Sequence, residues 1–111
     1  MGKNRDRLTI VAAILEAVNS GSTKTRIMYG ANLSFSLLEK YLQVVTKAGF
    51  LKVDGHRYNI TEHGRDFLKN YAYFHKRYDE AKKVIDSLEP ERERLAKLCE
   101  RSGFEALKTV A

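Results

Sequence analysis

The chain has 111 residues, of which 43% are hydrophobic and 31% are charged, and its formal net charge is +6. This length suits one small domain with an appendage, and the apolar share is sufficient for a modest core. Residues 1–65 hold ten Lys and Arg against five Asp and Glu, whereas residues 66–111 hold ten against nine. The basic front half predicts a polyanionic partner, with a chance asymmetry of solvated helix faces as the alternative.

Composition also limits where the protein is expected to act. The longest strongly apolar stretch, from Leu8 to Val18, is interrupted by Thr9 and Glu16 and is too short to span a membrane. The first residues do not resemble a signal peptide, because no continuous apolar segment follows them. The single cysteine, Cys99, excludes a disulfide framework and suits a reducing interior. We therefore expect a cytoplasmic protein without a membrane partner.

The front half predicts two helices and a turn. The first helix, over residues 5–19, has an apolar face made of Leu8, Val11, Ile14, Leu15 and Val18. A short second helix is expected from a Ser22 cap through Tyr29. Gly30-Ala-Asn is the predicted turn, since glycine inside a helix costs about 1 kcal/mol relative to alanine. Such an interruption is useful where two helices must cross at a steep angle.

A third helix and a hairpin follow. Ser34 is expected to cap a helix that ends near Ala48, with a buried stripe of Leu38, Tyr41, Leu42 and Val45. Apolar and polar residues then alternate over residues 51–60 around Asp54-Gly55, which predicts a β-hairpin. Thr61 is expected to cap the next helix. This order predicts a mainly α fold with a small β-hairpin wing, a winged helix-turn-helix that continues into a long C-terminal helix.

A winged helix-turn-helix predicts a DNA-binding surface. Its first helix lies across the DNA backbone and its second enters the major groove. The polar face of the third helix here carries Ser36, Glu39, Lys40, Gln43 and Lys47. Glu39 can accept a hydrogen bond from a cytosine amino group or pair with a neighbouring lysine. Lys24 and Arg26 on the second helix are expected near phosphates, and His56 and Arg57 at the hairpin tip in or beside a minor groove. The alternative is a winged helix that docks a protein instead of DNA.

The last helix carries a seven-residue apolar repeat that starts at Phe67, and this repeat predicts a homodimer. The predicted dimer interface consists of Tyr71, Phe74, Tyr78, Ala81, Ile85, Leu88 and Leu95. The alternative for the first positions is that they pack onto the wing and the first helix. A parallel pair would oppose Arg77 and Lys82, whereas one antiparallel register opposes Arg77 and Glu91. Charge pairing therefore favours an antiparallel coiled coil.

Three segments are expected: a winged-helix DNA-binding domain over residues 1–65, a dimerisation helix over 66–101 and a tail over 102–111. Pro90 lacks an N–H group and should kink or break the helix near its position, with a restart there.

The residues do not indicate a catalytic or metal site. His56, His63 and His75 lie in different predicted elements and lack the spacing of metal ligands. The glycines form no phosphate-binding loop, and no nucleophile is paired with a base. We expect no enzyme activity, no cofactor, no metal and no small-molecule substrate.

The run KTRIMYGANLSFSLLEKYL at residues 24–42 and the run YNITEHGRDFLKNY at residues 58–71 carry a resemblance. They resemble the archaeal 10a-type winged-helix chromatin proteins over most of residues 5–88. The resemblance implies a nucleoid-associated homodimer joined by an antiparallel coiled coil. It also implies that the DNA surface includes Lys24, Arg26, Ser34, Ser36, Lys40 and Arg57. Pro90 and the segment up to Ala111 depart from the family's simple long helix, and a sequence-specific transcription regulator of the same fold is the alternative function.

Overall fold

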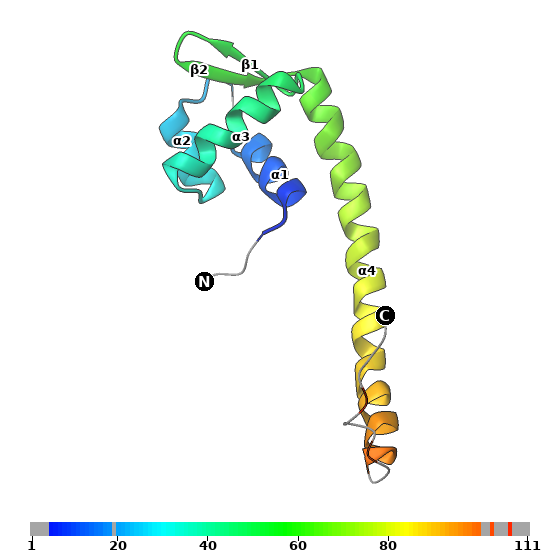
Figure 1. Cartoon of the computed structure of the whole chain (residues 1–111). Coiled ribbons are helices and arrows are strands. Elements are labelled where there is room, and N and C mark those ends of the chain that lie inside the picture. The colour runs from blue at the N-terminus through cyan, green and yellow to red at the C-terminus, as the bar shows by residue number, and fades with distance from the viewer. Residues whose placement is uncertain (1–4, 19, 101–102, 104–106, 108–111) are drawn as a thin grey trace. The chain divides into compact units, whose positions relative to one another are not determined.

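The computed structural model describes residues 5–18, 20–100, 103 and 107. Its elements, in chain order, are α1 (Arg7–Ala17), α2 (Lys24–Ala31), α3 (Phe35–Lys47), β1 (Leu51–Asp54), β2 (Arg57–Ile60) and α4 (Glu62–Leu98), as Figure 1 shows. The chain divides into two compact units, of which the first ends at Tyr73 and the second begins at Phe74. The predicted order of three helices, a hairpin and a long helix is confirmed.

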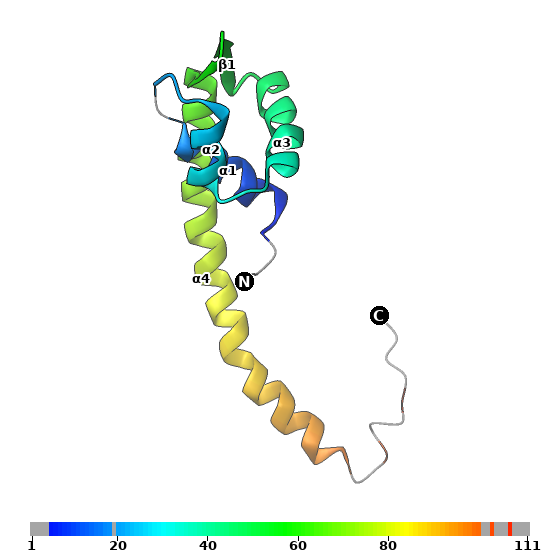
Figure 2. The ribbon, with the colours of Figure 1, turned by 90° about the vertical axis from the view of Figure 1, so that its left-hand side faces the viewer.

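The corner between α2 and α3 differs from the predicted one (Figure 2). Helix α2 continues through Gly30 and Ala31, and the chain turns at Asn32, which has a left-handed backbone with φ 57° and ψ 55°. The prediction that Gly30 belongs to the turn is therefore wrong. A Cβ atom at Gly30 would lie 2.9 Å from the Cβ of Ala17, so the glycine allows a close approach of α1 and α2. Packing between α1 and α2 explains the glycine at position 30, which local helix propensity had placed in the turn.

Two predicted helix caps are confirmed. The Ser34 hydroxyl accepts a hydrogen bond of 3.2 Å from the Leu37 amide at the start of α3. The Thr61 hydroxyl accepts one of 3.0 Å from the Gly64 amide and donates one of 2.5 Å to the Gly49 carbonyl. These bonds satisfy amides that have no partner within their own helix, and they fix where α3 and α4 begin.

The predicted Ser22 cap of α2 is wrong. Thr23 caps this helix, with its hydroxyl accepting a 3.3 Å hydrogen bond from the Arg26 amide. Ser22 is buried, and its backbone pairs with that of Tyr58 through N···O distances of 3.0 and 2.7 Å. The residue before the cap thus adds a bridge to the hairpin and ties α2 to the wing.

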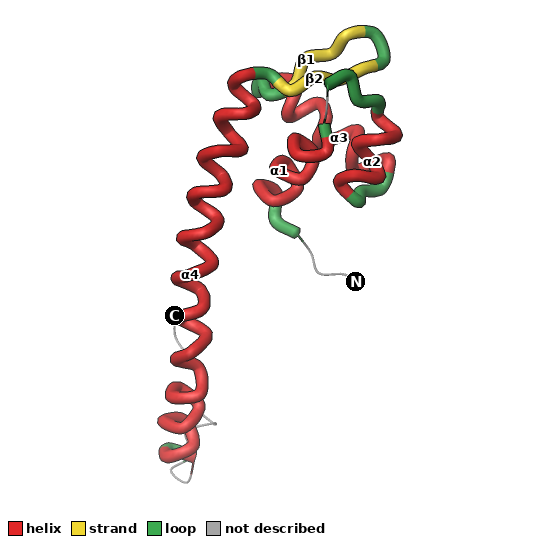
Figure 3. The backbone as a smooth tube through the Cα atoms, turned by 180° about the vertical axis from the view of Figure 1, so that it is seen from behind, coloured by secondary structure: helices red, strands yellow, loops and turns green. Residues whose placement is uncertain are grey.

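The wing is a two-stranded antiparallel hairpin (Figure 3). Leu51 pairs with Ile60, and Asp54 pairs with Arg57. Asp54 therefore belongs to β1, and the two-residue turn consists of Gly55 and His56. Leu51 is buried, so the inward face of the hairpin closes one side of the core.

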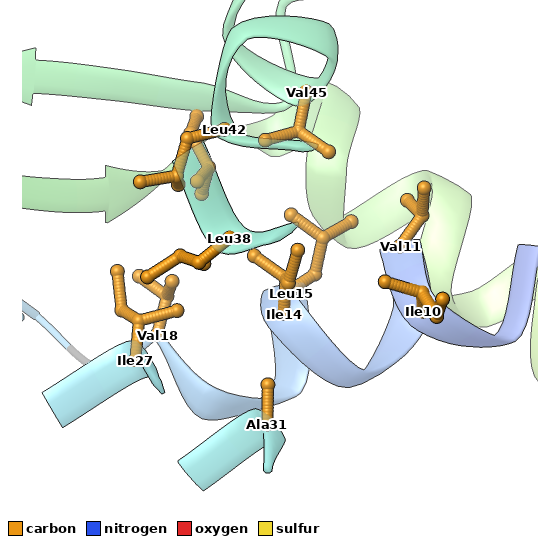
Figure 4. Packing of buried hydrophobic residues seen from close by; sticks show 11 residues of the cluster. Ile10, Val11, Ile14, Leu15, Val18, Ile27, Ala31, Leu38, Leu42 and Val45 are labelled. Carbon is orange, nitrogen blue, oxygen red and sulfur yellow. The ribbon is translucent and has the colours of Figure 1, made fainter. Parts of the chain in front are cut away.

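The core lies where α1, α2 and α3 meet (Figure 4). Its most completely buried side chains are Ile14, Leu15, Ile27, Leu38 and Val45. The predicted stripe of α3 is confirmed, with Tyr41 partly buried beside it. Leu8 was expected in the core but is 48% exposed, whereas Ile10 and Ala12 are buried. Burial surrounds the middle of α1 on more than one side, so a single-face pattern misplaces its first turn.

Helix α4 has 37 residues and continues through Pro90, so the expected break and restart are absent. Its first turns belong to the first unit, because Phe67 and Leu68 pack against the core. The hydroxyls of Tyr71 and Thr9 are 2.9 Å apart. Among the described helices, none has a stretch long and apolar enough to cross a membrane. The predicted tail over residues 102–111 lies outside the described residues, apart from Gly103 and Leu107.

Gly64 provides a test of the packing between α4 and the hairpin. A Cβ there would meet the Phe50 carbonyl oxygen and would lie 2.8 Å from Cγ1 of Ile60. We expect Gly64→Ala to lower the free energy of unfolding by about 1–3 kcal/mol through overpacking. Urea denaturation followed by circular dichroism measures this change. The exposed Ala72 gives the control, since Ala72→Gly reports helix propensity alone, and a stabilised Gly64→Ala protein would contradict the prediction.

Candidate nucleic-acid interface

Helix α3 presents one line of exposed polar side chains, which we call the outward line: Ser36, Lys40, Gln43 and Lys47. These residues are separated by steps of four, three and four, so they share one face of the helix. The face opposite them carries Leu38, Leu42 and Val45, which are buried in the core. The line has a length of about 16 Å at the usual helical rise. Four predicted DNA-binding residues are thus brought together, and none of them is acidic.

The outward line continues toward the wing. A hollow of about 290 Å³ lies between α3 and the hairpin, and its lining residues are Glu39, Leu42, Gln43, Thr46, Lys47 and Tyr58. Gln43 and Lys47 therefore belong to the outward line and also line the hollow beside the wing. The arrangement gives α3 and the hairpin one continuous surface.

Lys24, the first residue of α2, is held against α3 by two contacts. Its Nζ lies 2.7 Å from Oε2 of Glu39 and 5.8 Å from the centroid of the Phe35 ring. The hydrogen bond to the Glu39 carboxylate raises the pKa of Lys24, so the ammonium form is favoured. Lys24 was expected near phosphate, and in the free protein its charge is paired with an acid of the next helix.

The two predicted wing residues have different surroundings. His56 lies exposed in the turn of the hairpin. Arg57 is exposed as well, but its Nη1 donates a 2.6 Å hydrogen bond to the Gly21 carbonyl. Asn59 accepts a 2.7 Å bond from the Gly21 amide, so the outer face of β2 holds the loop before α2. Arg57 therefore has a structural task in addition to any contact with a partner.

Sequence reasoning missed Lys52 as a candidate. It is exposed on β1 and pairs in register with Asn59, so it stands on the outer face of the hairpin. The alternation of Leu51, Lys52 and Val53 is the signal that predicts this orientation. Lys52 adds a positive charge to the wing.

The predicted residues of α2 face two different hollows. Lys24 borders one of about 360 Å³, which is lined by Thr23, Lys24, Thr25, Gly55, His56 and Tyr58. Arg26 borders another of about 500 Å³, which it shares with Glu16 of α1 and Tyr29. Arg26 is exposed, and Thr25, between Lys24 and Arg26, borders both hollows.

Arg5 holds the corner of the helix-turn-helix, and sequence reasoning did not find it. Its Nη2 donates 2.9 Å hydrogen bonds to the carbonyls of Ala31 and Asn32. These carbonyls end α2, where unpaired acceptors and the helix dipole both favour a cation. The partners lie 26 and 27 residues away, so no local signal identifies the contact.

The remaining chemistry of the described residues is simple. Within that part of the chain, no three His, Cys, Asp or Glu side chains gather to form a possible metal site. Cys99 is a free and exposed thiol just beyond the end of α4. The arrangement around α3 brings lysines, a serine and a glutamine beside the wing, which makes it the candidate binding surface.

Known proteins show the same architecture. The model of the winged helix-turn-helix family matches residues 4–88. Sso10a-2, a DNA-binding protein from Sulfolobus solfataricus, is 26% identical with a TM-score of 0.53, over 96% of this chain and 100% of that chain. The resemblance to archaeal 10a-type proteins is confirmed by these two findings.

Two further comparisons add context. An uncharacterised protein of Methanocaldococcus jannaschii is 34% identical over 62 residues, which are 55% of this chain and 64% of that protein's length. ZitR from Lactococcus lactis is 17% identical with a TM-score of 0.51, over 96% of this chain and 81% of that chain. At this identity the likeness to ZitR shows the fold alone.

The corner contact of Arg5 can be tested by its effect on stability. We expect Arg5→Ala to lower the free energy of unfolding by about 1–3 kcal/mol, because a charged donor is removed from two carbonyls. The neighbouring Arg7→Ala is the control, since Arg7 is exposed and a change there should stay within about 0.5 kcal/mol. Chemical denaturation of both variants gives the comparison, and equal losses would argue against the corner contact.

Proposed function

Because this chain belongs to the winged helix-turn-helix family, we propose that it binds duplex DNA as a homodimeric chromatin or nucleoid protein. The observation that carries the proposal is the outward line of α3, which is exposed and polar and carries two lysines. A major groove about 12 Å wide accepts a helix that presents such a face. The similar Sso10a-2 is a DNA-binding protein, which supports the same role here.

The proposed binding mode assigns each element a position on DNA. Helix α3 enters the major groove, where Lys40 and Lys47 reach phosphates or base edges. Amides at the start of α3, behind the Ser34 cap, favour a nearby phosphate. Helix α2 lies across the backbone with Lys24 and Arg26. The wing contributes His56, Arg57 and Lys52 at the adjacent minor groove.

The side chains of the outward line can contact phosphates or base edges. It has no arginine or asparagine, but lysine and glutamine also pair bidentately with guanine and adenine. Arg57, a predicted surface arginine, already bonds to the Gly21 carbonyl. Lysines supply most of the charge, and lysine contacts to phosphate position a protein without reading bases. Gln43 is the residue through which an operator-specific regulator would be recognised.

The second unit supports the proposal of a dimer. Tyr78 and Ile85 are each 58% exposed, Leu88 is 51% exposed and Leu95 is 65% exposed. They continue the seven-residue repeat with Phe74 and Ala81, and a stripe of this length needs a cover in water. A second copy of the same helix supplies it in an antiparallel coiled coil. Tyr71 already contacts Thr9 in its own chain, so we propose that the interface begins at Phe74.

DNA binding is tested by fluorescence anisotropy of a labelled random duplex of roughly 25 base pairs, titrated across a salt series. We expect sub-micromolar binding at low salt that weakens steeply as salt increases, because each phosphate contact adds about −0.9 to the log–log slope. Lys40→Ala should lower the affinity for every sequence alike and flatten that slope by about one contact.

The exposed Lys69 of α4 supplies the matched control, and Lys69→Ala should change neither affinity nor slope by as much. A Kd no tighter than about 10 µM at low salt would remove the chromatin proposal, since non-specific binders have Kd values of about 10⁻⁴–10⁻⁶ M at physiological salt and bind far more tightly at low salt. A Gln43→Ala protein that loses affinity for one sequence only would favour the regulator instead.

The dimer is tested by analytical ultracentrifugation at micromolar concentration. We expect twice the chain mass of 12.7 kDa for the natural protein and a monomer for Ile85→Lys, because a lysine in the seam is poorly accommodated. The monomer should bind DNA more weakly, because in a dimer the binding of one winged-helix domain raises the effective concentration of the other at the DNA. Ser87→Lys adds the same charge at an exposed position outside the repeat and should remain dimeric. A wild-type monomer would refute the dimer.

A further inference from the structure

Glu39 is the single acid among residues 24–47, a segment that also carries Lys24, Arg26, Lys40 and Lys47. It precedes Lys40 on α3 and borders the hollow between α3 and the wing. An acidic side chain beside a surface proposed for DNA repels phosphate, so its presence there needs a reason.

The contacts of Glu39 point to Lys24. Its Oε2 accepts a 2.7 Å hydrogen bond from Nζ of Lys24, which also lies above the Phe35 ring. The two charged side chains retain 40% and 38% of their exposed surface. Ion pairs this exposed contribute little to folding stability, because water screens them and side-chain entropy opposes them. A contribution to folding stability is therefore not a sufficient reason for the Lys24–Glu39 ion pair.

Lys24 stands at a place where phosphate has access. It is the first residue of α2, the helix that crosses the DNA backbone in this fold. The adjoining hollow is lined by the hydroxyl residues Thr23 and Thr25 and by His56. A phosphate that approaches there must compete with the Glu39 carboxylate for the same ammonium group.

We propose that Glu39 competes with DNA phosphate for Lys24 and so lowers the affinity of the protein for duplex DNA of any sequence. The proposal rests on the proposed function. A lysine neutralised by a carboxylate in the free protein replaces no counterion when it meets DNA, so it adds nothing to the salt dependence. Binding therefore uses one phosphate contact fewer than the number of basic residues on the surface suggests.

A second role for Glu39 makes the opposite prediction. A glutamate in the major groove can accept a hydrogen bond from the amino group of cytosine. Removal of a base-reading residue weakens binding to its target and leaves other sequences unchanged. Removal of a competitor strengthens binding to all sequences, so the sign of the effect separates the two roles.

The experiment compares wild type, Glu39→Gln and Glu39→Ala by anisotropy on random and cytosine-free duplexes across a salt series. We expect both variants to bind about three- to tenfold more tightly at 0.1 M salt, with a log–log slope steeper by about 0.9. Alone, Lys24→Gln should weaken binding, because it leaves the Glu39 carboxylate unpaired beside the phosphates. In the Glu39→Gln background it should remove the gain, which completes a double-mutant cycle.

Glu62→Gln is the matched control, because Glu62 is exposed in the first turn of α4 and its loss changes net charge equally. An equal gain in this control would assign the effect to net charge and overturn the proposal. If wild type binds DNA and Glu39→Gln has the same affinity and slope, the competition proposal is overturned while the proposed function stands. Weaker binding of Glu39→Gln to cytosine-containing DNA only would also overturn the competition proposal. If wild type itself does not bind, the proposed function fails and this proposal falls with it.

Discussion

The surface chemistry of this protein depends on the burial of one face of α3. Leu38, Leu42 and Val45 enter the core formed with α1 and α2, and helical geometry then turns Ser36 and Lys40 outward together with Gln43 and Lys47. The outward line is therefore a consequence of packing. A change that rotates α3 would displace the buried and exposed sets at once, since neither can move alone.

Three basic residues of the first unit are held by contacts within the chain, whereas others are exposed without a role in packing the unit. Arg5 bonds to carbonyls at the corner, Arg57 bonds to the Gly21 carbonyl and Lys24 pairs with Glu39. Lys40, Lys47 and Lys52 are exposed in the part of the chain that the structure describes. A count of positive charge in the sequence thus overstates what a polyanion meets. In our proposal, the charge available to DNA lies on α3, on the outer face of the wing and at Arg26 of α2.

Helix α4 serves two purposes along one continuous repeat. Its first turns complete the winged helix, where Phe67 packs on the core and Tyr71 meets Thr9. From Phe74 onward the repeat belongs to the second compact unit, and its apolar side chains are exposed. The same spacing thus supports intrachain packing first and then, in our proposal, association between chains. Periodicity alone does not distinguish these uses, because both bury the same face.

The sequence by itself determined the features that depend on near neighbours. Hydrogen bonds between residues a few positions apart make the caps at Ser34 and Thr61. Pairing between residues close in the chain likewise makes the hairpin over residues 51–60, and the order of helices follows from such local signals. The outward line was predictable for the same reason, since helical spacing is local. Only the tertiary structure decided that Gly30 makes room for Ala17 and that Glu39 neutralises Lys24. These contacts join residues 13 and 15 positions apart on different helices, so their energies arise only once the helices have packed.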